Sequence, residues 1–311
     1  MEYTVVATSY NDRDNIENYI SDIVNQSFKP SRIIVVDGGS TDGTEIMAER
    51  LLGLNGINYL VISGRRLTIA QGYNEAIRNS KTEYIGITGI GNRYDKDFFY
   101  ELSKDLPIDG DASYPLLRGE NRNHFSEVYN ITFLNGESGL RSSFPSNHGC
   151  LIKKSIFEDL GYFHEGFVHA GEDSEFYELL IGRNYELSIS EGAVVRWETP
   201  LSFKEFCKQL RSYTIGDMQR LSQKRFFSRY RYCVLGLLVT ISIILFGMYN
   251  AFNGATVISM TCFASVLLEL IFLKLKAGRR SLILITIKRV MPLIYAFGNI
   301  RFLGKEYNIN R

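Results

Sequence analysis

Short apolar runs alternate with longer amphipathic stretches through the first part of this 311-residue chain. Four consecutive β-branched residues, Ile33–Val36, are bounded by turn residues, which is typical of a strand buried on both faces. Residues 16–24 carry apolar side chains at helical spacing and predict a helix with one buried face. Strands and helices that alternate in this way predict an α/β fold, in which helices cover both faces of a mostly parallel sheet.

The other elements are expected wherever the same two periodicities recur. Strands are expected at 3–8, 58–62, 84–88, 111–117, 147–153 and 193–195, and helices at 42–54, 69–79, 96–106 and 155–160, with two more that begin near residues 173 and 202. Residues 120–146 are polar and irregular. The sequence therefore predicts a loop there.

The apolar pattern changes character near the C-terminal end. The stretch KRFFSRYRY is dense in arginine and aromatic residues, and it precedes an uncharged segment, 233–252, that is long enough to cross about 30 Å of hydrocarbon. A second apolar segment, 255–273, contains one acid and is followed by a basic loop. Residues 281–302 carry two central cations and predict an amphipathic helix on the membrane surface, with a third span as the alternative.

These segments predict two domains, residues 1–222 and an α-helical membrane region, 223–311. Basic residues flank the hairpin of two spans on both sides, which places both of its ends in the cytoplasm. The N-terminus, MEYTVVATSYND, enters a strand pattern at once and lacks the features of a signal peptide. We therefore expect a multi-pass protein of the cell membrane, with its first domain on the cytoplasmic face.

Composition narrows the classes of function. The net charge is +1, so no global field favours nucleic acid as a partner. The four cysteines are scattered, without a CxxC pair or a histidine at ligand spacing. This argues against a structural zinc site or a disulfide framework and fits a reducing compartment.

Polar and small residues gather where the second predicted strand ends. The second strand ends on Asp37, and Gly38, Gly39, Ser40 and Thr41 follow it before a helix begins. Open α/β sheets bind ligands in the crevice at the carboxyl ends of their strands. The same stretch also fits a strand, a turn and a capped helix without a ligand.

The order of three motifs, ATSYND, VVDGGSTDGT and AQGYNEAI, resembles the nucleotide-binding half of family 2 glycosyltransferases, which have the Rossmann-like GT-A fold. The likeness runs through most of the first two hundred residues, and it extends to the membrane-attached enzymes of exopolysaccharide assembly, such as the succinoglycan glucosyltransferases. It implies that the first loop and Asp37 hold a nucleoside. The donor-binding residues that it implies are Thr8, Ser9, Tyr10, Asp37, Gly39, Ser40, Arg66, Asn74, Asn92 and Arg93.

The chain departs from this family at the metal site. The family ends its fourth strand with a pair of acids, or an acid and a histidine, that bind Mg²⁺ or Mn²⁺, whereas Gly89 and Gly91 stand there in this chain. Such a cation could still bind, but its usual ligands are missing. Either Arg93, with Arg65 or Arg66, neutralises the leaving diphosphate, or the site has decayed and only binds a sugar nucleotide or a partner.

The second half of the resemblance concerns the acceptor. The residues AGEDSEF match the family's ED motif, which implies that Asp173 is the catalytic base of an inverting transfer. Acids before a helix are also good capping residues, and that structural interpretation stays open. On the acceptor and diphosphate side, the resemblance implies Glu172, Arg196, Trp197, Gln209 and Arg211, next to the loop 120–146.

The sequence thus favours a membrane-anchored inverting glycosyltransferase. It would move a sugar from a nucleotide-sugar donor to a lipid-linked, polyprenyl-type glycan acceptor in the assembly of a cell-surface polysaccharide, alone, as a homo-oligomer or beside a partner transferase. The alternative is a catalytically silent GT-A module that serves as a nucleotide-binding or scaffolding subunit.

Overall fold

The computed structural model describes residues 1–134, 140–142, 146–167 and 170–220, together with the helical positions 242–243, 245–246 and 248–249. The described residues fall into two compact units. The first comprises residues 1–120 and the described part of 138–199, and the second comprises the described part of 121–137 with the residues after 199. The predicted domain boundary at residue 222 stays a prediction.

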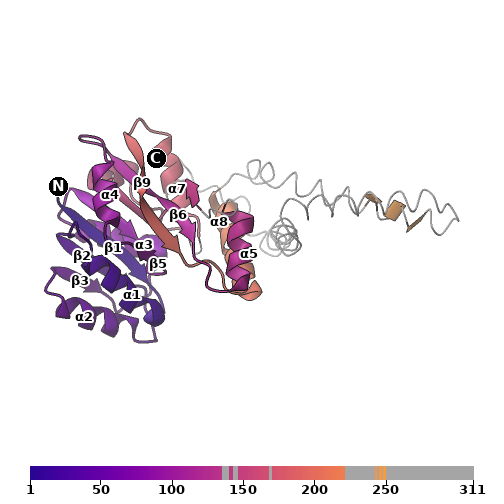
Figure 1. Cartoon of the computed structure of the whole chain (residues 1–311), viewed down its shortest axis with the longest axis horizontal. Coiled ribbons are helices and arrows are strands. Elements are labelled where there is room, and N and C mark those ends of the chain that lie inside the picture. Colours follow the sequence, from indigo (N-terminus) through magenta and orange to yellow (C-terminus); the bar gives the residue numbers. More distant parts are fainter. Residues whose placement is uncertain are drawn as a thin grey trace. The chain divides into compact units, whose positions relative to one another are not determined.

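A nine-stranded sheet forms the centre of the first unit (Figure 1). Its order is β3-β2-β1-β4-β8-β6-β9-β5, and β7 pairs with β6. The strands are β1 (Tyr3–Ser9), β2 (Arg32–Asp37), β3 (Tyr59–Ile62), β4 (Tyr84–Thr88), β5 (Asn92–Tyr94), β6 (Ala112–Gly119), β7 (Leu140–Ser142), β8 (Gly149–Lys153) and β9 (Leu187–Trp197).

The sheet is mixed, so the prediction of a mostly parallel sheet holds for only part of it. The neighbouring strands β3, β2, β1 and β4 are parallel, as the alternation of strands and helices predicts. Beyond β4 the pairs β4–β8, β6–β8, β6–β7 and β5–β9 are antiparallel, and only β6–β9 is parallel. A buried strand has the same apolar pattern in a parallel pair and in an antiparallel pair. The sequence pattern therefore did not distinguish the two kinds of pairing.

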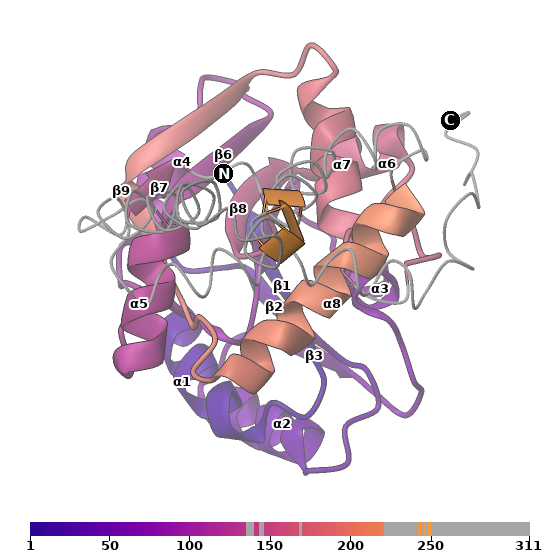
Figure 2. The same ribbon diagram turned by 90° about the vertical axis from the view of Figure 1, so that its right-hand side faces the viewer.

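Helices cover both faces of this sheet, as expected. The helices are α1 (Arg13–Val24), α2 (Thr44–Leu54), α3 (Ile69–Asn79), α4 (Phe98–Lys104), α6 (Lys154–Leu160) and α7 (Glu172–Ile181). On β4, Ile85 and Ile87 belong to the core cluster that α3, α6 and α7 share. Between them, Gly86 points to the opposite face, where a Cβ atom would lie 2.7 Å from the ring of Phe99 on α4. Figure 2 shows α6 and α7, which pack against each other.

The second unit contains α5 (His124–Phe133) and α8 (Phe203–Arg220), which lie side by side in Figure 1. The prediction that residues 120–146 form a loop is therefore wrong for His124–Phe133, which form α5, and for Leu140–Ser142, which form β7. A capping box between Asn123 and Ser126 starts α5, and the Phe133 ring on its far end stacks on Phe206 of α8 with centroids 5.7 Å apart. Aromatic residues recur at every fourth position of α5, and all three of their rings contact Phe206. The polar residues between them made this face hard to recognise in the sequence.

Among the described helices, none is both long and apolar enough to cross a membrane. The predicted spans, 233–252 and 255–273, and the predicted surface helix, 281–302, lie outside the described residues except for the helical positions between 242 and 249.

Candidate functional site

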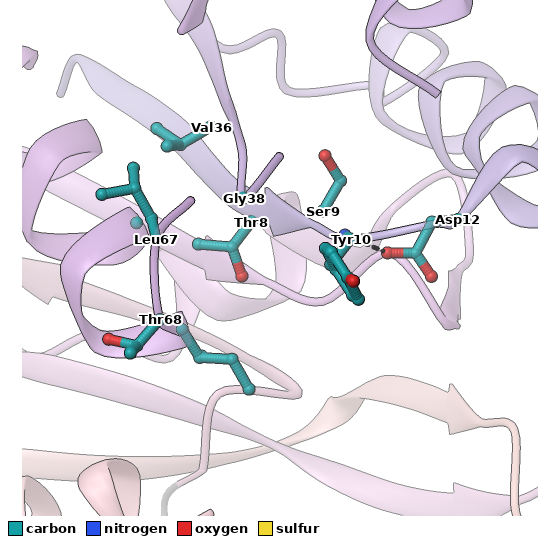
Figure 3. Close-up of a pocket in the computed structure, with 10 residues that line it drawn as sticks. Thr8, Ser9, Tyr10, Asp12, Val36, Gly38, Leu67 and Thr68 are labelled. Atoms are coloured by element: carbon teal, nitrogen blue, oxygen red, sulfur yellow. Dashed lines mark hydrogen bonds between the residues drawn. The ribbon is translucent and has the colours of Figure 1, made fainter. Parts of the chain in front are cut away.

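A pocket of about 240 Å³ opens at the carboxyl ends of β1 and β2, next to the first turn of α3 (Figure 3). This is the edge of the sheet where the sequence predicts a ligand. Three of the donor-binding residues that the resemblance implies border it, Thr8, Ser9 and Tyr10. Its other lining residues are Asp12, Val36, Gly38, Leu67, Thr68, Ile69 and Gly72.

Asp37 builds one wall of the pocket through the loop that follows it. Asp37 is 1% exposed, and its carboxylate accepts four hydrogen bonds. Oδ1 accepts from the hydroxyls of Ser9 (2.9 Å) and Ser40 (2.6 Å), and Oδ2 accepts from the backbone N–H groups of Gly39 (3.0 Å) and Ser40 (2.8 Å). Gly39 has a φ of +88°, which favours glycine. The predicted residues Asp37, Gly39 and Ser40 thus hold the loop in shape, and both oxygens of Asp37 already have partners.

Asp12 is a pocket residue that the sequence analysis did not assign. One carboxylate oxygen accepts a hydrogen bond from the Tyr10 backbone N–H (2.9 Å), while the side chain borders the pocket (Figure 3). Burial raises the pKa of this carboxyl, and the charges of Asp42 and Asp37 raise it further. Asp12 ends the loop after β1 as Asp37 ends β2, so the rule that assigned Asp37 could have found it.

Gly72 lets α3 approach β1 closely behind the pocket. A Cβ atom at this position would lie 2.5 Å from Cγ2 of Thr8. We therefore expect Gly72→Ala to push Thr8 into the pocket and to weaken the binding of a nucleoside diphosphate by about tenfold, since a displacement of this size disrupts several contacts.

The second substitution Thr8→Ser removes Cγ2 and should restore most of the affinity in the Gly72→Ala background. Isothermal titration calorimetry with UDP and GDP measures the affinity of the single and the double variant. Equal losses in the single and double variants would contradict the steric explanation.

Two neighbouring arginines lie before α3, and their side chains have different partners. Arg65 forms an ion pair with Glu75 of α3 at 2.7 Å. The guanidinium of Arg66 lies over the Tyr10 ring, 5.7 Å from its centroid, at the pocket wall. Thr68 caps α3 through a reciprocal capping box with Gln71. Of the two arginines, Arg66 is the one beside the pocket.

Asn74 is buried and uses its amide inside the protein. Its Nδ2 donates to the Phe163 carbonyl oxygen (2.8 Å) and to Glu165 (2.9 Å), and its Oδ1 accepts from the Phe163 N–H (2.9 Å). These bonds hold α3 against the turn that follows α6. Asn74 supports the helix beside the pocket and is not among the residues that line it.

The turn after β4 is held by uncharged groups. The Tyr94 hydroxyl accepts from the Gly89 N–H (2.8 Å) and donates to the His148 carbonyl oxygen (2.6 Å). Oδ1 of Asn92 lies 3.2 Å from Nδ1 of His148. Burial lowers the pKa of His148 to about 4 and raises that of Tyr94 well above its usual value. Both side chains are therefore neutral near pH 7.

Charged residues next to this turn pair with each other. Arg93 binds Asp22 of α1 through two parallel bonds, Nε–Oδ2 (2.7 Å) and Nη2–Oδ1 (2.9 Å). The Arg93 guanidinium, which was expected to bind a diphosphate, therefore binds the Asp22 carboxylate instead. Arg196 forms an ion pair with Asp95 at 2.8 Å, and the Trp197 ring packs against His148 with centroids 4.8 Å apart.

The residues at the family's metal position do not fit a divalent cation. Gly89 and Gly91 carry no ligand atom, and the Asn92 amide oxygen faces His148. Within the part of the chain that the structure describes, no group of three or more His, Cys, Asp or Glu side chains is placed to hold a metal ion. A hard cation needs several oxygen ligands, with one or two carboxylates among them.

Glu172 and Asp173 form the first turn of α7, which packs against α3. Glu172 is 5% exposed, and its Oε2 has no hydrogen-bond partner among the described residues. Burial raises the pKa of Glu172 to about 8, with a smaller contribution from the charge of Asp173. Asp173 is more accessible, and its Oδ1 accepts from the Ser174 N–H (2.6 Å). The pair thus combines a neutral buried acid with a more exposed carboxylate.

Gln209 and Arg211 lie on α8 in the second unit. The Gln209 amide accepts from the Tyr129 hydroxyl of α5 (3.0 Å) and donates to the Tyr213 hydroxyl (3.3 Å). Arg211 is exposed. Their predicted functions on the acceptor side stay predictions.

Comparison with family models gives two matches. The model for Glycosyl transferase family 2 matches residues 4–161, and the model for Glycosyl transferase family group 2 matches residues 117–274. The first match covers half of the chain and includes the whole of the pocket and the turn after β4.

Two curated proteins are similar in sequence. One is the dolichyl N-acetyl-alpha-D-glucosaminyl phosphate 3-beta-D-2,3-diacetamido-2,3-dideoxy-beta-D-glucuronosyltransferase of Methanococcus voltae, which is 25% identical over 228 residues (68% of this chain, 71% of the relative). The other is a Bacillus subtilis protein named for teichuronic acid biosynthesis as the glycosyltransferase TuaG, 27% identical over 103 residues (33% of this chain, 40% of the relative).

Solved structures share the fold at low identity. The mannosyltransferase PcManGT from Pyrobaculum calidifontis, in complex with GDP-Man and Mn²⁺, superposes with a TM-score of 0.61 at 18% identity and covers 96% of this chain and 87% of its own. TarS 1–349 from S. aureus, in complex with UDP, gives 0.50 at 18% identity, with coverage of 73% and 68%. At this identity the likeness shows the fold alone.

Proposed function

Because the chain belongs to glycosyl transferase family 2, and is thus a glycosyltransferase with a GT-A-like fold, we propose that it moves a sugar from a nucleotide-sugar donor to a lipid-linked, polyprenyl-type acceptor. The transfer inverts the configuration at the sugar carbon and belongs to the assembly of a cell-surface glycan. The observation that carries this proposal is the pocket at the carboxyl ends of β1 and β2.

The pocket suits the nucleoside end of a donor. Tyr10 is 50% exposed at its wall and offers an aromatic face, and Asp12 offers a carboxylate oxygen that can accept from a base or ribose. The wall that Asp37 supports is held rigid by four hydrogen bonds, and a rigid wall lowers the entropic cost of binding. The complexes of PcManGT with GDP-Man and of TarS with UDP support a nucleotide-sugar donor.

Asp173 is the residue that we assign as the general base. It would take the proton of the acceptor hydroxyl while this oxygen attacks the sugar carbon and the nucleoside diphosphate leaves from the opposite side. Its position on α7, the helix that packs against α3, supports this function. Glu172, protonated near pH 7, adds no second negative charge beside the base.

A lipid-linked acceptor is supported by the Methanococcus voltae relative, whose name specifies a dolichyl phosphate-linked sugar. The apolar segments 233–252 and 255–273 and the amphipathic segment 281–302 would anchor the chain at the cytoplasmic face of the membrane. An enzyme and an acceptor that share one surface meet more often than in free solution.

The test uses the full-length chain in membranes. UDP-sugars and GDP-sugars are supplied in turn, with and without a polyprenyl-phosphate-linked sugar, and the release of nucleoside diphosphate is measured. We expect one donor to be consumed, and its consumption to require the lipid-linked acceptor. Transfer to a water-soluble sugar at the same rate would contradict the lipid-linked acceptor. Nucleotide binding without any release would instead support the silent scaffolding module.

A further inference from the structure

We propose that this glycosyltransferase binds the diphosphate of its donor without a divalent cation, and that Arg66 supplies the positive charge that a metal ion would otherwise provide. The inference rests on the proposed nucleotide-sugar donor and specifies how the chain handles the charge of this donor.

The turn after β4 lies beside the pocket. In the parallel pair of β1 and β4, Val6 is opposite Ile87, and the Thr88 hydroxyl donates to the Val6 carbonyl oxygen (3.0 Å). The turn that begins at Gly89 therefore follows at the same edge of the sheet as Thr8. Thr8 lines the pocket. A cation that bridges the protein and a diphosphate in this pocket would therefore take its protein ligands from residues 89–92.

The turn cannot supply those ligands. A Cβ atom on Gly89 would lie 2.7 Å from Nδ2 of Asn92, so the amide already fills the space of a side chain at position 89. Asn92 itself is held by His148 and Tyr94. At Gly91 no atom lies within 4 Å of a Cβ position, so this space is open but holds no ligand. The side chains at this turn are the amide of Asn92, the phenol of Tyr94 and the imidazole of His148, and none of them is a carboxylate.

The acids on the other side of the pocket do not replace them. Both oxygens of Asp37 accept hydrogen bonds from the loop that they support. Both oxygens of Asp42 likewise accept, Oδ1 from Thr44 and Oδ2 from the Arg13 N–H. Asp12 remains at the pocket, but its Oδ2 accepts from the Tyr10 N–H, and the described residues place no group of three or more His, Cys, Asp or Glu side chains that would hold a cation with it.

Among the cations near the pocket, Arg66 is the one that the described residues leave available. Arg93 is bound to Asp22, Arg196 to Asp95, and Arg65 to Glu75. The Arg13 guanidinium, which follows Asp12, donates through Nη1 to the Asp42 carbonyl oxygen (2.9 Å). Arg66 contacts the Tyr10 ring, and no carboxylate of the described residues lies within ion-pair distance of it. A guanidinium presents N–H groups in a fork that matches phosphate oxygens, and its charge persists at every physiological pH. The first turn of α3, which lines the pocket, adds a favourable dipole.

The test measures the affinity of the full-length chain for UDP and GDP by calorimetry, with excess EDTA and again with Mg²⁺ or Mn²⁺. We expect affinities that agree within about twofold. Arg66→Ala should weaken binding by about tenfold to a hundredfold, the range for a hydrogen bond to a charged group. Arg66→Lys should lie between the two, because it keeps the charge and loses the fork. Arg50→Ala, which removes an exposed charge from α2, is the matched control and should leave the affinity unchanged.

A gain of charge at the turn provides an independent check. Gly91→Asp places a carboxylate in the open space beside the diphosphate, so it should weaken nucleotide binding in EDTA. Mn²⁺ should then restore part of the loss, because the new carboxylate gives the cation one ligand. An unchanged affinity in this variant would contradict the placement of the diphosphate beside the turn.

The outcomes separate this inference from the proposed function. Binding that is lost in EDTA and returns with Mn²⁺ would overturn the inference and leave the proposed donor in place. An Arg66→Ala variant with wild-type affinity in EDTA would overturn the assignment of Arg66. No binding of either nucleotide under any condition would overturn the proposed donor, and the inference with it.

Discussion

The Asp173→Asn variant is expected to transfer sugar about 10²-fold to 10⁴-fold more slowly than the wild type, the range for the loss of a general base. Asparagine has the size of aspartate but cannot accept the proton of the acceptor hydroxyl. Asp173 lies on α7, outside the pocket walls, so UDP or GDP should bind with an affinity within about twofold of wild type. Single-turnover transfer and nucleotide titration on the same preparation measure both quantities.

The control for this variant is Glu178→Gln, which neutralises an exposed carboxylate further along α7. It makes the same change of charge on the same helix, but at a residue that is not part of the site. The transfer rate should therefore be unchanged. A normal rate in Asp173→Asn would exclude Asp173 as the base. A parallel loss of nucleotide affinity and transfer rate would instead indicate that Asp173 shapes the donor pocket.

The Asp37→Ala variant should lose stability and nucleotide binding together. Four donors converge on this buried carboxylate, and alanine leaves them without an acceptor. We expect a loss of about 2–4 kcal/mol in the free energy of unfolding, because stranded buried donors are costly. The loop 38–40 would no longer hold its shape, so the affinity for UDP or GDP should fall by more than about a hundredfold, which corresponds to the loss of several such bonds.

Asp37→Asn separates the network from the charge. The remaining carbonyl oxygen can still accept from the backbone N–H groups of Gly39 and Ser40, and the serine hydroxyls can rotate to accept from the new amide. Its destabilisation should therefore be about 1 kcal/mol. Thermal unfolding and nucleotide titration compare the two variants. If Asn and Ala prove equally damaging, the carboxylate charge, and not the hydrogen-bond network, holds the loop.

The sequence predicted the first half of the sheet and the pocket well, because both depend on local patterns. The run Ile33–Val36 is buried as expected, and the pocket lies at the carboxyl end of the strand that it forms. The second half depends on pairings between distant segments, which periodicity does not encode. The strand β9 is an example: expected at 193–195, it extends over Leu187–Trp197 because it pairs with both β6 and β5.

The site residues show the same division. The family resemblance implied Ser9, Gly39 and Ser40 as site residues, and the structure brings them together around Asp37. Arg93 was expected to meet a phosphate, but its partner Asp22 lies 71 residues away in the chain. A pairing over this distance follows from the packing of α1 against β5, and the sequence alone does not show it.

The antiparallel strand β8 has a consequence for the order in which the protein folds. It lies between β4 and β6, so β4 remains an edge strand until residues 149–153 have been synthesised. During that time one side of β4 presents unpaired N–H and C=O groups, and such an edge readily pairs with another chain. The contacts that close it are far apart in sequence and form slowly. A chaperone would therefore protect the protein most while only its first half has been synthesised on the ribosome.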